Sequence, residues 1–135
     1  MDARLGLITS RALAAAWLVA ALLKGAHPEY GGVARLAALS GIGESVARSA
    51  YWLVFLIELS VGVGLLLRST RTVSLWLSLV LAGTMLIWWV LVDRGRGSCG
   101  CFGANIKMSA HVHVAILVGL LLASHLGLRR AAPRM

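Results

Sequence analysis

Two cysteines separated by a single glycine are the residues of this chain best suited to chemistry. They are the only cysteines in the sequence, and they lie in the string Cys99-Gly100-Cys101. Such a pair can close a disulfide only through a small, constrained ring, and glycine permits backbone angles that other residues resist. Strained, exposed disulfides are relatively oxidising, which suits exchange better than structural cross-linking. The spacing therefore predicts a redox-active pair, with two inert thiols as the alternative.

Basic residues lie close to this pair in the sequence: Arg94, Arg96 and Lys107. Nearby positive charge increases the fraction of thiolate, the form that attacks a disulfide or leaves from one. An equally good interpretation is that these residues only anchor helix ends at a membrane surface.

His111 and His113 offer another use for the cysteines, because two imidazoles and two thiolates are suitable ligands for tetrahedral zinc. Residues two apart on a helix point about 200° apart. Both imidazoles could therefore reach one metal only if the helix began after His113. Metal binding through Cys99, Cys101 and a histidine stays an alternative.

Glu58 is the third candidate, because it lies within an apolar segment and an ionisable group there suggests function. Its own segment contains no basic residue in its apolar body, so we expect an uncharged carboxyl that donates or accepts a proton near a buried ligand. The alternative is a hydrogen bond that joins two helices. Counted from Ser49, the rise of a helix places Glu58 about 13 Å below the surface. Contact with a cysteine loop at that surface would then require a re-entrant loop, ordered waters or a bound quinone.

Four apolar segments must position these residues, at about 7–23, 49–67, 73–92 and 108–128. Each is near the ~20 residues that a spanning helix needs. The chain of 135 residues is 59% apolar and only 13% charged, which is outside the range of ordinary soluble domains. We therefore predict an all-α membrane protein, a single domain over residues 1–135 that folds as an antiparallel bundle of four transmembrane helices. Gly62 and Gly64 are expected to permit close helix packing.

The first apolar segment follows Arg4 and Arg11, as the apolar core of a signal peptide would. It ends without a convincing cleavage site, and its removal would leave an odd number of spans, so we expect a retained helix. The long connection 25–48 contains an apolar pattern over 33–42 that suggests a short amphipathic helix at the interface.

The net charge of +8 comes from basic residues at segment ends, which is the pattern of membrane flanks and gives no support to nucleic-acid binding. Seven basic residues lie at the termini and the 68–72 turn, against six on the other side. The difference weakly favours cytoplasmic termini and an extracytoplasmic cysteine loop, where disulfides persist. Tyr51, Trp52, Trp88 and Trp89 lie on the cysteine side and suggest an aromatic belt, or the rim of a quinone or partner site.

The chain resembles the methylamine-utilisation protein MauE family, within the DoxX-like four-helix membrane proteins. The motif that carries the resemblance is Cys99-Gly100-Cys101-Phe102-Gly103 after a third helix. Supporting matches are Ala21-Leu22-Leu23-Lys24 followed by Pro28, and Glu58 in an apolar segment followed by Gly64-Leu65-Leu66-Leu67. The likeness covers about residues 14–122. Family members often carry arginine early in the fourth helix, where this chain has His111 and His113.

The resemblance implies a bacterial inner-membrane protein that assists disulfide formation or maturation of an extracytoplasmic protein, with a thioredoxin-like periplasmic partner. In the founding pathway the substrate is the small subunit of methylamine dehydrogenase. The chain has no second cysteine pair, so an internal two-disulfide relay is excluded, and partner thiols must exchange with Cys99 or Cys101 directly. A quinone is the electron acceptor that this chemistry suggests. A non-catalytic membrane scaffold for a maturation complex is the rival function.

Overall fold

The fold is a bundle of four long helices. The computed structural model describes residues 2–26, 28, 33–34, 37–38, 40–90 and 109–131. Its helices are α1 (Asp2–Ala26), α3 (Glu44–Leu66), α4 (Arg71–Trp88) and α5 (Ala110–Ala131). All four are long and apolar enough to cross a membrane, and the described residues contain no strand. The predicted all-α membrane fold is thus confirmed.

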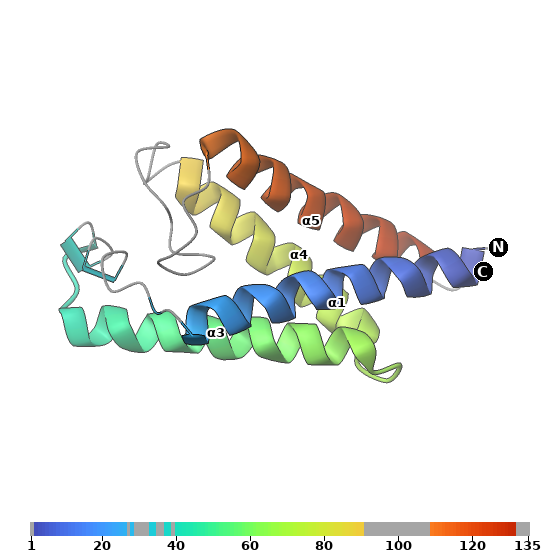
Figure 1. The fold of residues 1–135 in the computed structure, drawn as a ribbon, viewed down its shortest axis with the longest axis horizontal. Helices are drawn as coiled ribbons and strands as arrows, with labels where there is room; N and C mark the ends of the chain where they lie inside the picture. The colour runs from blue at the N-terminus through green and yellow to red at the C-terminus, as the bar shows by residue number, and fades with distance from the viewer. Residues whose placement is uncertain are drawn as a thin grey trace.

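Successive helices run antiparallel, as Figure 1 shows. α1 packs against α3 and α5, and α4 packs against the same two helices, so the four form a closed ring. One end of the bundle, here called the terminal end, contains the beginning of α1, the turn between α3 and α4, and the end of α5 (Figure 1). The other end, here called the loop end, contains the end of α1, the start of α3, the end of α4 and the start of α5.

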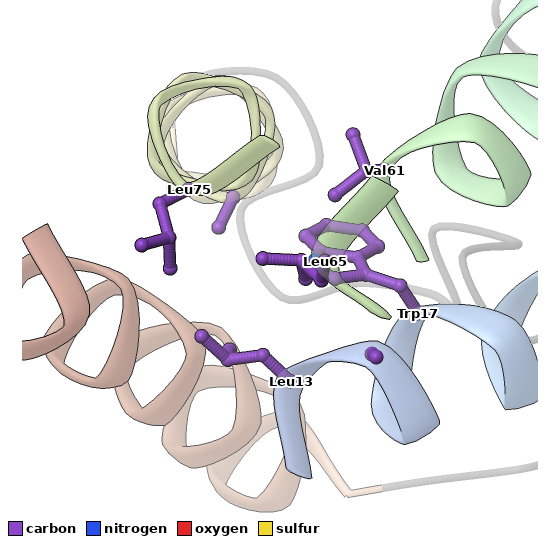
Figure 2. Close-up of a cluster of buried hydrophobic side chains, with 7 residues drawn as sticks. Leu13, Trp17, Val61, Leu65 and Leu75 are labelled. Carbon is purple, nitrogen blue, oxygen red and sulfur yellow. The ribbon is translucent and has the colours of Figure 1, made fainter. Parts of the chain in front are cut away.

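The buried side of each helix follows a spacing of three and four residues, as in coiled coils. On α1 the buried positions of this seam are 10, 14, 17, 21 and 24, and on α5 they are 113, 117, 124 and 127. Positions three and four apart lie on one face of a helix, so each helix presents one continuous stripe to its neighbours. The core lies where these stripes meet, and Figure 2 shows its largest members: Leu13, Trp17, Val61, Leu65 and Leu75.

The distribution of polarity is the reverse of that in a water-soluble bundle. Several polar side chains are buried: Ser10, Lys24, Glu58, Ser74, Ser78, His113 and Ser124. The outward positions are held instead by large aliphatic residues such as Leu22, Val80 and Leu122, which are 67%, 61% and 59% exposed. An apolar exterior around a partly polar interior is what a hydrocarbon solvent requires.

Glycines allow α3 to approach both of its neighbours. A Cβ atom on Gly62 would lie 2.8 Å from Cγ of Leu18 on α1, and one on Gly64 would lie 2.2 Å from Oγ of Ser74 on α4. Both distances are too short for real contacts, so a larger residue would require the side chain of Leu18 or Ser74 to shift. The expectation that these glycines serve helix packing is confirmed.

The helices are staggered along the bundle. α3 begins at Glu44, before the apolar segment predicted from Ser49, and it extends past the end of α1 at the loop end (Figure 1). α1 in turn extends past α3 at the terminal end. The helix expected over 33–42 falls on a connection that is only partly described, where residues 33–34, 37–38 and 40 are helical.

Candidate functional site

A buried ion pair between two helices is the most unusual polar feature of the bundle. The ammonium group of Lys24 on α1 donates a hydrogen bond to Oε1 of Glu58 on α3. The two side chains are 3% and 1% exposed, so the pair is shielded from solvent. Both residues occupy buried seam positions of their helices, and their charges meet inside the bundle instead of at its surface.

The end of α1 is built to hold Lys24 in this place. Lys24 lies in the last turn of α1, where a cation interacts favourably with the helix dipole. Its backbone carbonyl is one of those left without a partner within the helix, and the hydroxyl of Tyr51 on α3 donates to it across 3.4 Å. The ring of Phe55 packs against Gly25, where a Cβ atom would lie 3.1 Å from Cε2.

The Tyr51 ring also begins a short row of aromatic side chains on α3. Tyr51 and Trp52 meet edge to face with ring centroids 5.7 Å apart, and Trp52 and Phe55 do so at 5.4 Å. Offset and edge-to-face arrangements are the favourable ones for aromatic rings. The row places aromatic residues beside the ion pair at the loop end, on the side of the bundle where the sequence predicted an aromatic belt.

One oxygen of the ion pair has no donor. Glu58 Oε2 is buried and accepts no hydrogen bond from any described residue. A buried ion pair recovers its desolvation cost, several kcal/mol per ion, only when the remaining lone pairs are satisfied as well. The site is therefore a paired but incompletely satisfied carboxylate, able to accept one further hydrogen bond or a proton.

Lys24 changes two expectations about Glu58. The expectation that Glu58 is uncharged rested on the absence of a basic residue from its own segment, and Lys24 on α1 supplies a nearby cation. The depth of about 13 Å was counted along α3 alone, and the contact with Lys24 adds a second reference, because α3 projects beyond α1. Lys24 lies two residues before Ala26, the last residue of α1, which corresponds to about 3 Å of helix rise. Relative to α1, Glu58 thus lies within a turn of the loop end.

A second buried group lies at the loop end of α4 and α5. The imidazole of His113 is 6% exposed and stacks on Trp89, with ring centroids 6.1 Å apart and planes inclined by 21°. Trp89 and Val90 form a π-helical turn after α4, a deviation that is frequent at functional sites. His111, two residues earlier on α5, is exposed.

The exposure of His111 and the burial of His113 agree with the argument that residues two apart on a helix cannot bind one zinc ion together. α5 already begins at Ala110, so His111 and His113 occupy different faces of one helix and do not converge. Among the described residues, no group of three or more His, Cys, Asp or Glu side chains could hold a metal ion.

Cys99 and Cys101 lie outside the described residues, as do Arg94, Arg96 and Lys107. The described chain stops at Val90 and resumes at Ser109, and both of these residues lie at the loop end. The segment that carries the cysteines is therefore joined to the bundle at the end that holds the Lys24 and Glu58 pair and the His113 and Trp89 stack.

Lys24 is the residue of this site that sequence reasoning missed, because a lysine at the end of an apolar segment is usually an interfacial anchor. A signal was present in the spacing. Lys24 continues the series Ser10, Ala14, Trp17 and Ala21, which is small or aromatic at steps of three and four. A charge that falls on such a seam faces a neighbouring helix.

Comparison with known proteins gives one match. The family model described as "Methylamine utilisation protein MauE" matches residues 2–129, nearly the whole chain. No curated protein and no solved structure matches the chain.

Proposed function

The chain belongs to the family of the methylamine utilisation protein MauE, and we propose that it is a membrane thiol-disulfide redox protein that assists the maturation of an extracytoplasmic protein. The observation that carries the proposal is the Cys99-Gly100-Cys101 pair, which contains every cysteine of the chain. Four candidate membrane spans make the chain a multi-pass membrane protein. A bundle held by its helices does not need a cross-link between adjacent loop residues.

The proposed reaction is an exchange between two cysteine pairs. A thiolate of an extracytoplasmic thioredoxin-like protein attacks the disulfide between Cys99 and Cys101, which forms a mixed disulfide and releases one thiolate on this chain. The second thiol of the partner then displaces this chain, so the partner becomes oxidised and the pair here becomes a dithiol. Two electrons have moved, and the chain is oxidised again when a membrane acceptor of the quinone class takes both electrons and both protons.

The arrangement of charge supports cytoplasmic termini. Over the full sequence, seven basic residues lie at the termini and the 68–72 turn, against six on the loop side. An excess of Lys and Arg marks the cytoplasmic side of a membrane protein. The loop end, and with it the cysteine segment, would then face the oxidising side.

Within this scheme we assign Glu58 the role of proton acceptor or donor in the bilayer. Its buried position and its unsatisfied Oε2 support the assignment.

The rival function is a scaffold that holds a maturation complex without chemistry of its own. The redox function requires the two cysteines, whereas the scaffold does not.

The test reads the oxidation state of the two thiols directly. Membranes that contain the chain are treated with a thiol-alkylating reagent with and without prior reduction, and the mass shift is measured. A redox protein should show a reducible fraction, and a Cys99→Ser or Cys101→Ser variant should accumulate a mixed disulfide with its partner on non-reducing gels. Maturation that persists in the Cys99→Ser, Cys101→Ser double variant would establish the scaffold instead.

A further inference from the structure

The unsatisfied oxygen of the ion pair singles out one atom of the bundle. Glu58 accepts a hydrogen bond from Lys24 through Oε1, while Oε2 is buried and has no donor among the described residues. Leaving a buried acceptor unsatisfied is costly, more so when it is charged. Among the described residues, Oε2 is therefore a buried acceptor at which an added proton or donor would be favourable.

The surroundings favour a very small ligand. Lys24 and Glu58 are 3% and 1% exposed, which leaves little access for a bulky molecule, whereas a proton needs no space. We propose that Glu58 and Lys24 form an intramembrane proton-binding site, in which the proton binds at Oε2 and Lys24 positions the carboxylate through Oε1. The proton comes from a water molecule or hydronium ion at the loop end, and the carboxylate becomes a carboxylic acid.

The stagger of the helices places this site near the loop end of α1. Lys24 lies two residues before the end of α1, about 3 Å of rise, so the pair is close to the loop end of that helix. At the middle of the bilayer an extra charge would be far more costly than near the interface. Protonation changes the net charge of the pair from zero to positive, and the position of Lys24 near the end of α1 favours that change over one at the helix centre.

Among the described residues of the loop end, few other groups titrate. Tyr51 on α3 contacts the Lys24 carbonyl, and His113 on α5 is buried against Trp89. α4 carries no ionisable side chain after Arg71. The remaining described acid at the loop end, Glu44, is 62% exposed in its pair with Arg48. Glu58 is thus the only buried carboxyl among the residues that the structure describes, and its protonation should be spectroscopically separable.

This site extends the proposed function. The use of the stored proton rests on that function, whereas the existence of the proton site does not. Thiol-disulfide exchange requires one thiol to lose a proton and one leaving thiolate to gain one. A group that stores a proton at the loop end would serve both steps. The proton binding itself depends only on Lys24 and Glu58, so it can be tested without the cysteines.

The experiment uses infrared difference spectra of the full chain in liposomes, recorded between acid and neutral pH. We expect a protonated-carboxyl band that grows on acidification and that is lost in Glu58→Gln. The matched control is Glu44→Gln, which removes the exposed carboxyl of the same helix and should keep the band. In Lys24→Gln the band should already be present at neutral pH, because the cation that holds the carboxylate ionised is gone.

The control for folding is the Lys24→Gln, Glu58→Gln double variant, which removes both charges together. It should keep native helicity while lacking the carboxyl band. The Cys99→Ser, Cys101→Ser variant should keep the band as well, so an absence of thiol exchange in the wild-type protein would refute the redox function and leave the proton site standing. A wild-type spectrum without a carboxyl band that depends on Glu58 would overturn the proton site, as would an unchanged spectrum in Lys24→Gln.

Discussion

Trp17 on α1 donates its indole N–H to the hydroxyl of Ser78 on α4 across 2.8 Å. Ser124 on α5 donates its one hydroxyl proton to the carbonyl of Leu120 across 2.7 Å. In the bond of 2.8 Å between Ser78 and Ser124, Ser78 is therefore the donor. Three helices are thereby joined by a chain of hydrogen bonds in which every donor has an acceptor.

Removal of the middle hydroxyl should destabilise the bundle. Ser78→Ala leaves the indole N–H of Trp17 buried without an acceptor, and we expect a loss of roughly 1 to 2 kcal/mol in the free energy of unfolding. The measurement is denaturant unfolding in detergent micelles. The control is Ser60→Ala, an exposed serine that bonds only to Leu56 of its own helix and whose loss should stay within about 0.5 kcal/mol. Equal losses in both variants would refute the chain as a stabilising unit.

Gly64→Ala should separate α3 from α4 near their turn, because its Cβ would lie 2.2 Å from Oγ of Ser74. We expect a destabilisation of about 1 to 3 kcal/mol, partly relieved by Ser74→Ala in the same chain. Gly119→Ala on α5 is the matched control, since no atom lies within 4 Å of the added Cβ. Alanine favours helix, so that variant should be neutral or more stable by up to about 1 kcal/mol. Thermal denaturation of the purified variants distinguishes the two positions.

The Lys24 and Glu58 pair should be more sensitive to the loss of one partner than to the loss of both. Lys24→Met leaves the Glu58 carboxyl buried without its cation, so that it loses the ion pair and has to take up a proton, and should cost about 3 kcal/mol or more. The Lys24→Met, Glu58→Leu double variant removes both charges and should recover much of that loss. The exposed pair provides the comparison, because Arg48→Ala should change stability by less than about 1 kcal/mol. Additive losses in the double variant would exclude a coupled pair.

Reporter fusions should place both ends of the chain in the cytoplasm. Fusions after Ser69, in the turn between α3 and α4, and after Met135 are expected to be active as cytoplasmic reporters. A fusion after Ile42, just before α3, should be active only as an extracytoplasmic reporter. A reversed pattern would place the cysteine segment in the reducing compartment and would contradict exchange with an extracytoplasmic partner.

The fold was predictable because hydrocarbon leaves few choices to an apolar chain. Segments without charge on any face must form helices in lipid, and this requirement alone gave the four-helix bundle. The position of Glu58 was predictable in the same way, since one acidic residue among leucines is conspicuous in the sequence.

The partner of Glu58 was not predictable from local pattern. Whether Lys24 faces Glu58 or the interface depends on the stagger of α1 against α3, and that stagger follows from contacts between distant residues such as Leu18 and Gly62. Sequence periodicity gives the face of each helix but not the offset between two helices.

The helices differ in length, and this has a consequence for the surrounding lipid. α1 has 25 residues and α4 has 18, or about 37 Å and 27 Å of rise. A hydrocarbon layer of about 30 Å cannot match both when they stand upright. α1 must tilt or the bilayer must thin around α4, and either adjustment costs free energy for each ångström of mismatch. The protein is therefore expected to be most stable in bilayers of intermediate thickness and to lose stability when the acyl chains are made either shorter or longer.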